Sequence, residues 1–374
     1  MRNSVDGPAV PNDDADRGGA HDGADRGADD GADDGTGRDA GPGAGPGAGP
    51  GAGLRVDLDA GLSWSRTVPR ALVHRTSPAE VLLTDVRAVG AGGVGGSPGE
   101  GRGDGGEVGG AGLFRAAAFW PRSHATFPAE GGDLHSPLLV VETLRQLGIY
   151  LPLRWYGVPP TAQLLIDDLF FALRPGGEPL AGHGGTEVGC SIRVTDPHYR
   201  PDGGLAALRL TVALRAGGRL FATAGGGARF LSAERYAAVR GGLLHARRTP
   251  PDPAGRPAPA LLGVARGGDV LIARRAGGLT VEPADLRQPF FFDHPSDHVP
   301  GMVLLEAARQ AAAAASGGEL LRPLNGRMAA VRFTEYEPAA VVEAVPHDRT
   351  LVFRVRQGGV ATAYGVLGYG RHAV

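Results

Sequence analysis

The sequence carries one motif twice, and the spacing of the two copies limits the folds open to the chain. "DLHSPLLVVETLRQLGIYLP" (133–152) and "DHVPGMVLLEAARQAA" (297–312) align when one is shifted by 164 residues. The shift superimposes three polar residues of each copy: Glu142 on Glu306, Arg145 on Arg309, and Gln146 on Gln310. Two copies of E-x-x-R-Q this far apart indicate a duplicated domain and not a short solenoid repeat.

Each copy predicts a long helix that follows a proline-containing turn. We expect one helix over about Pro137–Tyr156 and the other over 299–316. Leu, Val and Ala surround the charged residues of both copies. A carboxylate on such a helix costs free energy unless it has a partner or a task. The Glu and Arg of each copy are therefore either part of a site or an ordinary i, i+3 pair, worth a few tenths of a kcal/mol.

Segments with strand-like alternation surround both helices. In the first half they lie at 80–89, 113–121, 162–174, 187–196, 205–216 and 219–231, and in the second at 269–276, 327–338, 339–346, 350–357 and 361–370. Consecutive strands favour an antiparallel sheet, which must cover the one long apolar helix of its half. The predicted fold class is α+β, a tandem hotdog fold. In it each half is a curved antiparallel sheet around one long helix, and the halves pack as an internal pseudo-dimer.

The composition changes along the chain and predicts the domain boundaries. Residues 1–53 hold eleven Asp and four Arg, have no aromatic residue, and end in a Gly/Pro/Ala repeat. Such a segment cannot bury enough apolar surface to become ordered, so we expect a disordered acidic tail. We expect hotdog domains over 54–235 and 266–374, joined by an Arg/Pro/Gly-rich linker over 236–265. The Gly-rich stretch 90–112 reads as a flexible loop in the first domain.

Charge, apolar runs and cysteine use exclude several classes of protein. Without the tail, the net charge is about +5, too weak to indicate nucleic-acid binding but suited to small anions or an acidic carrier protein. There is no apolar run of about 18 residues and no signal-peptide pattern, so we expect a cytoplasmic protein with no membrane span. A lone cysteine, Cys190, cannot form an intrachain disulfide or a Cys-based zinc site, and we expect a buried structural thiol.

Three stretches together resemble the A-factor biosynthesis (AfsA) family. They are "LVHRTSPAEVLLTD" (72–85), "WPRSHATF" (120–127) with the first helix motif, and "FFFDHPSDHVPGMVLLEAARQAA" (290–312). The resemblance covers about residues 54–374. It implies an acyltransferase of γ-butyrolactone autoregulator biosynthesis, which moves a β-ketoacyl group from an acyl-carrier-protein thioester to dihydroxyacetone phosphate. It also implies no metal or redox cofactor.

Acyl transfer to a hydroxyl requires a base, donors for the thioester oxygen and positive charge for the phosphate. Glu142 and Glu306 are the candidate bases. Arg145 and Arg309 can clamp phosphate or orient the carboxylates. Gln146 and Gln310 are expected to hold the carboxylates and contact substrate. The helix that begins near Gly301 offers unpaired N–H groups as an oxyanion site.

Histidines before the two helices are further candidates. His294 stands twelve residues before Glu306, in the loop where the similar β-hydroxyacyl carrier-protein dehydratases carry a catalytic His. His124 occupies the matching loop of the first half more loosely. His135 and His298 are expected only to hydrogen-bond their loops, and for His74 and Arg75 both a structural and a functional role are open. The His294–His298 pair lies in a proline-interrupted loop and not on a helix, so we expect no metal there.

Two other functions are open at this point. One is a hotdog dehydratase or thioesterase, and the other is a non-catalytic module that binds an acyl ligand. Arginine on both helices favours the acyltransferase, because a dehydratase has no phosphate to hold. The sequence does not specify the acyl chain, which half is catalytic, whether two chains form a homodimer, or which secondary-metabolite pathway is controlled.

Overall fold

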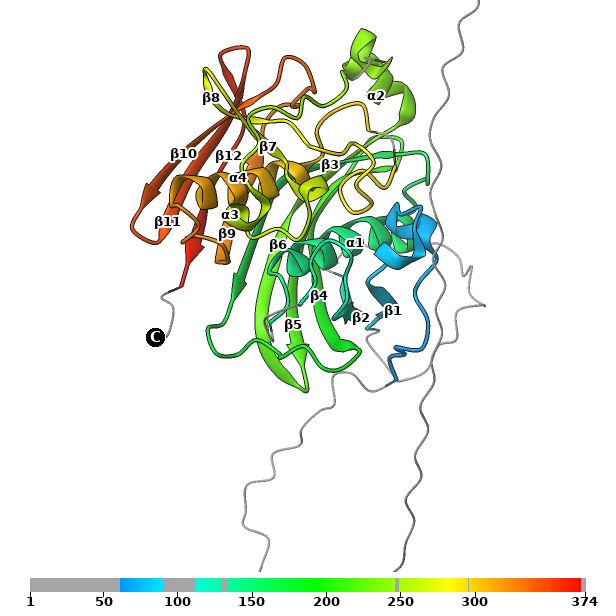
Figure 1. The fold of residues 1–374 in the computed structure, drawn as a ribbon. Coiled ribbons are helices and arrows are strands. Elements are labelled where there is room, and N and C mark those ends of the chain that lie inside the picture. The colour runs from blue at the N-terminus through cyan, green and yellow to red at the C-terminus, as the bar shows by residue number, and fades with distance from the viewer. Residues whose placement is uncertain (1–60, 90–111, 130–133, 246–248, 295, 371–374) are drawn as a thin grey trace, which may run out of the picture. The chain divides into compact units, whose positions relative to one another are not determined.

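Twelve antiparallel strands form one continuous sheet (Figure 1). The computed structural model describes residues 61–89, 112–129, 134–245, 249–294 and 296–370; the predicted acidic tail and nearly all of the Gly-rich stretch lie outside them. The first six strands are β1 Leu83–Ala88, β2 Leu113–Pro121, β3 Gln163–Leu173, β4 Gly185–Tyr199, β5 Leu205–Ala216 and β6 Arg219–Leu231. The other six are β7 Ile272–Arg275, β8 Gly278–Val281, β9 Pro323–Ala330, β10 Val341–His347, β11 Thr350–Gln357 and β12 Val360–Tyr369.

The strand order gives the sheet an internal pseudo-twofold symmetry. It runs β1-β2-β4-β5-β6-β3-β9-β12-β11-β10-β8-β7, so the second half repeats the first in reverse. The halves meet where β3 pairs with β9, with Phe170 opposite Arg327 and Ala172 opposite Asn325. This confirms the predicted tandem hotdog fold, with both halves sharing one sheet.

One long helix crosses the same side of the sheet in each half (Figure 1). α1 spans Leu138–Trp155 after β2, and α4 spans Gly301–Ala315 after β8. Both begin and end within two residues of the prediction. Each is buried over most of its surface, including Glu142 on α1 and both Glu306 and Arg309 on α4. Those charges therefore need partners inside the protein.

Short helical turns precede the first strand of each half. In the first half these are η1 Arg70–Val73 and η2 Pro78–Glu80, and in the second α3 Pro259–Leu262 and η4 Gly267–Asp269. Their backbone groups are available to the polar side chains of the long helices.

Four elements differ from the strands and linker expected from the sequence. β8 was not predicted, because it is only four residues long and begins with glycine. The strand expected over 327–338 is β9, which begins earlier and ends at Ala330. Part of the predicted linker is helical: α2 spans Ala233–Arg240, its N-terminus capped by the Ser232 side chain, and η3 spans Gly241–His245.

Two smaller expectations concern the membrane and the cysteine. Across the described ranges, no helix is both long and apolar enough to span a bilayer. Cys190 is buried in β4, within the core of the first half, as predicted for a structural thiol.

Candidate active site

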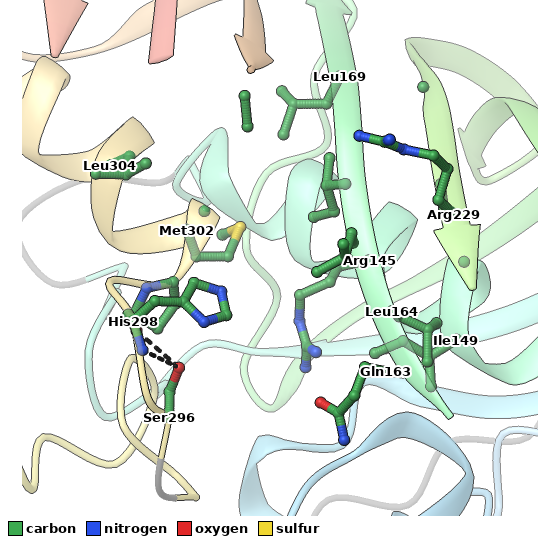
Figure 2. A pocket seen from close by; sticks show the side chains of 18 of the residues that line it. Arg145, Ile149, Gln163, Leu164, Leu169, Arg229, Ser296, His298, Met302 and Leu304 are labelled. Atoms are coloured by element: carbon green, nitrogen blue, oxygen red, sulfur yellow. Dashed lines mark hydrogen bonds between the residues drawn. The ribbon is translucent and has the colours of Figure 1, made fainter. Parts of the chain in front are cut away.

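A cavity of about 550 Å³ lies between the two halves. Its walls come from α1, β3, β6 and β9, and the loop 290–300 and the first turn of α4 border it (Figure 2). The cavity is largely apolar, lined by Leu144, Ile149, Leu164, Leu169, Leu208, Met302, Leu304 and Met328. A lining of this kind suits a hydrocarbon chain.

Glycine in β6 forms part of this cavity wall. A Cβ atom at Gly226 would lie 2.2 Å from the carbonyl oxygen of Asp168 on β3, so no larger residue fits without moving the strands apart. A Cβ atom at Gly225 would lie 2.5 Å from the carbonyl oxygen of Leu210 on β5, so the close approach of the strands explains the first two glycines of the "GGG" at 225–227.

Cationic and imidazole side chains gather along another part of the cavity. Arg145 from α1 lines it together with His74, Arg75 and His294. Burial, Arg145 and His294 lower the pKa of His74 to about 4. Burial and then Arg145 also lower the pKa of His294, against the effect of Asp293. Both imidazoles are therefore neutral near pH 7, and the positive charge comes from the two arginines.

Glu142 ties these two arginines together beneath the cavity. Its Oε1 accepts from Arg75 Nε at 3.3 Å, Arg145 Nη2 at 2.9 Å and Gln146 Nε2 at 2.7 Å, and Arg75 Nη2 lies 2.8 Å from the same oxygen. Its Oε2 accepts from Arg145 Nε at 2.8 Å. Arg75 also donates from Nη1 to the carbonyl oxygen of Phe290 at 2.6 Å, which links α1 to the loop before α4.

This environment makes Glu142 a weak base. Burial alone would raise its pKa, but Arg145 and Arg75 outweigh burial and lower the pKa to about 2. Glu142 is fully buried and is not among the described residues that line the cavity. Arg145 does line the cavity, and 16% of its side-chain surface is exposed. Of these two residues of the motif, Arg145 is therefore the one that reaches the cavity.

The second E-x-x-R-Q copy has the same internal pairing and different surroundings. Arg309 donates to Glu306 Oε2 at 2.7 Å and Oε1 at 2.5 Å. Its Nη1 donates to the carbonyl oxygens of Leu262 and Leu321 at 2.9 and 3.1 Å. Glu306, Arg309 and Gln310 are not among the described residues that line the cavity.

The two glutamines fasten each helix to the turn before the first strand of its half. Gln146 donates to the carbonyl oxygen of Glu80 at 2.8 Å and accepts from Leu82 N–H at 2.9 Å. Gln310 donates to the carbonyl oxygen of Asp269 at 2.9 Å and accepts from Leu271 N–H at 2.8 Å. Each Nε2 also donates to the glutamate four residues before it, so both amides are engaged within the protein.

His124 in the first half and Gln288 in the second occupy equivalent positions and accept equivalent hydrogen bonds. His124 Nδ1 accepts from the N–H groups two and three residues later, and so does Gln288 Oε1. On the other side, His124 Nε2 lies 3.5 Å from Glu80 Oε2, and Gln288 Nε2 donates to Asp269 Oδ1 at 3.0 Å. His124 is buried and is not among the described residues lining the cavity.

Gly301 and Met302 bring the N-terminus of α4 to the cavity wall. The N–H groups of Val303 and Leu304 donate to the carbonyl oxygen of Pro300, which leaves those of Gly301 and Met302 without an acceptor among the described residues. The N-terminus of a helix carries a partial positive charge. The N–H groups of Gly301 and Met302 form the kind of donor set that the sequence predicted for a developing oxyanion.

The loop before α4 is bound to α2. Arg240 donates from Nε to Asp297 Oδ2 at 2.5 Å and from Nη1 to Glu335 Oε1 at 2.6 Å. Tyr236 donates its hydroxyl to Asp297 Oδ1 at 2.6 Å, and His298 Nδ1 lies 2.9 Å from the same oxygen. Within the described ranges, no three His, Cys, Asp or Glu side chains are placed to hold a metal ion.

Comparison with known proteins identifies the family. The family model described as the A-factor biosynthesis hotdog domain matches residues 57–232 and 250–363. The chain belongs to this family. Two AfsA-family relatives carry the name 2-oxo-3-(phosphooxy)propyl 3-oxoalkanoate synthase. The one from Streptomyces virginiae is 35% identical over 75% of this chain and 87% of its own length. The one from Streptomyces griseus is 35% identical over 65% of this chain and 81% of its own.

Among solved structures, an acyl-ACP thioesterase from Bacteroides thetaiotaomicron aligns with a TM-score of 0.41 and 11% identity. The alignment covers 69% of this AfsA-family chain and 98% of the thioesterase.

Of the residues predicted from the sequence, Arg145, His294 and Gly301 line the cavity of this AfsA-family chain. Tyr236 and Arg240 were missed because 236–265 was read as linker. The signal was present: Ser232 is a good N-cap, a run of helix formers follows, and Gly241 ends it. Gln288 was also missed, although the 164-residue shift places it on His124.

Proposed function

We propose that this protein transfers a β-ketoacyl group from an acyl-carrier-protein thioester to the hydroxyl of dihydroxyacetone phosphate. The product is the ester that the names of the Streptomyces relatives describe, a 3-oxoalkanoate of the phosphorylated triose. In this proposal the protein supplies an early step of γ-butyrolactone autoregulator biosynthesis. A metal or redox cofactor has no part in the step.

The observation that carries the proposal is the division of the cavity. An apolar wall suits the acyl chain, and Arg145 with Arg75 provides positive charge in the same cavity. A planar guanidinium binds phosphate through paired hydrogen bonds. We assign the phosphate to Arg145, held in place by Glu142, and the acyl carbonyl oxygen to the first turn of α4 at Gly301.

In this assignment the two copies of the motif have different roles. Glu142 and Gln146 position Arg145. Glu142 is not the base, and Gln146 does not contact substrate. Glu306, Arg309 and Gln310 stabilise the second half, and His124 stabilises the loop before α1. We keep the division into domains 54–235 and 266–374 as part of the proposal, with residues 236–265 connecting them.

The partners also belong to the proposal. A carrier-bound acyl group and a triose phosphate are both made inside the cell, so we place the reaction in the cytoplasm. A homodimer of tandem hotdogs stays a prediction, which the mass of the purified protein by light scattering would test.

Product analysis tests the function. Purified full-length protein is incubated with a β-ketoacyl acyl carrier protein and dihydroxyacetone phosphate, and products are followed by mass spectrometry. We expect a phosphorylated β-ketoacyl ester that depends on both substrates. Free β-keto acid without ester would indicate a thioesterase, and turnover of a β-hydroxyacyl carrier protein to the enoyl form would indicate a dehydratase. Binding of the acyl group without turnover would indicate a binding module.

A further inference from the structure

His298 lies in the loop before α4, and its ring borders the cavity (Figure 2). Its Nδ1 lies 2.9 Å from Oδ1 of Asp297, and its ring packs edge-on against Phe333 with 4.8 Å between centroids. The Ser296 hydroxyl donates to the carbonyl oxygen of His298 at 2.7 Å. Side chain and backbone are therefore both fixed.

The contact with Asp297 determines which nitrogen of His298 can take up a proton. An ionised carboxylate only accepts hydrogen bonds, so Nδ1 carries the hydrogen of the neutral ring. The lone pair is then on Nε2. No described residue forms a hydrogen bond to Nε2, and the ring borders the cavity, so this acceptor is available to a ligand.

The groups packed around His298 keep Asp297 ionised. Burial would raise the pKa of Asp297, but hydrogen bonds from Tyr236, Arg240 and His298 outweigh burial and lower it to about 2. For His298, burial lowers the pKa, Asp297 and Glu335 oppose it, and Arg240 adds to it, with a net decrease from 6.5. His298 is therefore neutral near pH 7, in the form that accepts a proton.

We propose that His298 is the general base of the acyl transfer and that Asp297 is its positioning residue. This inference rests on the proposed function. Nε2 of His298 takes the proton of the dihydroxyacetone phosphate hydroxyl as that oxygen bonds to the thioester carbonyl carbon. The carbonyl electrons move to its oxygen, which faces the N–H groups at the start of α4. When the carbon–sulfur bond breaks, sulfur leaves with the electron pair and takes the proton back from Nε2.

Position supports this assignment over the glutamates. Glu142 is a weak base with every oxygen engaged, and Glu306 does not line the cavity. His298 precedes Gly301 by three residues, so the proton acceptor and the oxyanion donors come from one short segment. The arrangement of a base oriented by a carboxylate beside an oxyanion site is what acyl transfer requires.

Substitution of His298 tests the proposal. Full-length His298→Gln is compared with wild type and with His347→Gln, an exposed histidine on β10 outside the site. The substrates are 3-oxooctanoyl-N-acetylcysteamine and dihydroxyacetone phosphate, and ester is measured by mass spectrometry. We expect His298→Gln to have the melting temperature of wild type. Its kcat should fall by a factor of about 10²–10⁴, the usual effect of removing a positioned base. His347→Gln should retain full activity.

The pH dependence separates catalysis from a structural role. Wild-type kcat/KM should fall on the acid side, with an apparent pKa below 6.5, as His298 takes up a proton. Asp297→Asn removes a charge that raises the pKa of His298, so this limb should move to lower pH while the plateau rate falls. A wild-type profile with no acid limb at any pH at which the protein stays folded would overturn the proposal even if neither variant folds.

The outcomes also separate this proposal from the proposed function. Wild-type protein that forms no ester would overturn the function, and this inference with it. An active wild type beside a folded and equally active His298→Gln would overturn the assignment of the base alone. Loss of the acid limb in His294→Gln and not in His298→Gln would overturn it as well.

Discussion

Arg145 and Arg309 occupy equivalent positions on the two long helices and have different surroundings. The Arg145 guanidinium borders the cavity, whereas the Arg309 guanidinium is buried against the carbonyl oxygens of Leu262 and Leu321. Each is held by the glutamate three residues before it. The two copies of the motif thus share their internal hydrogen bonds and differ in access to the cavity.

Glu142→Gln should weaken the fold and phosphate binding more than the chemical step. The substitution leaves Arg75 and Arg145 without their shared counter-charge, and breaking a buried ion pair costs roughly 3–5 kcal/mol. We expect a lower melting temperature and a higher KM for dihydroxyacetone phosphate, with kcat within about tenfold of wild type. Circular dichroism and steady-state kinetics measure these quantities.

Glu306→Gln is the matched control, because it removes the same charge from the other copy. It should lower the melting temperature and leave the KM for dihydroxyacetone phosphate unchanged. A folded Glu142→Gln with normal KM and a kcat reduced by about 10²–10⁴ would instead make Glu142 the base.

His124→Gln should be tolerated. Gln288 already makes the equivalent hydrogen bonds in the second half, accepting from two backbone N–H groups and donating to a carboxylate. We expect activity within about twofold of wild type and a small change in melting temperature, whereas His124→Leu, with no acceptor, should destabilise by about 1–3 kcal/mol. A specific rise in the KM for either substrate in His124→Gln would show instead that His124 contacts substrate.

The stability of the first half should depend on pH through Glu80. Burial, with Glu142 adding to it and Arg75 opposing it, raises the pKa of Glu80 to about 7. A raised pKa means that the folded state holds the proton more tightly, so Glu80 contributes stability below about pH 4.5 that is lost as pH rises to about 7. Glu80→Gln keeps the neutral form and should raise the melting temperature at pH 8 relative to wild type. The difference should disappear near pH 4.5. Equal melting temperatures at pH 8 would contradict the shift.

The sequence was enough to predict the long helices and most strands. Apolar residues run through both helices, and strand alternation is clear wherever one face of the sheet is covered, as in β5 and β11. β8 could not be predicted from the sequence, because four residues provide too little alternation to detect. The pairing of β3 with β9 is a contact between distant segments, which local pattern does not encode.

The site was less predictable, because residues at equivalent positions of the two halves have different surroundings. The repeat predicted two similar Glu–Arg pairs, but whether Arg145 or Arg309 reaches a cavity depends on how the halves pack. His298 was expected only to hydrogen-bond its loop, because nothing in the local sequence shows that its ring borders a cavity. Its place on the cavity wall follows from the fold.

The most direct test of the account is the KM for dihydroxyacetone phosphate in Arg145→Lys and Arg309→Lys, measured at saturating β-ketoacyl thioester. Lysine keeps the charge and loses the paired hydrogen bonds to phosphate. Arg145→Lys should raise this KM by about tenfold or more, since a hydrogen bond to a charged group is worth about 1.5–3 kcal/mol, and should leave the KM for the thioester nearly unchanged. Arg309→Lys should lower the melting temperature without changing either KM. If Arg145→Lys binds dihydroxyacetone phosphate as wild type does while Arg309→Lys does not, the cavity beside Arg145 is not the phosphate site and the account is wrong.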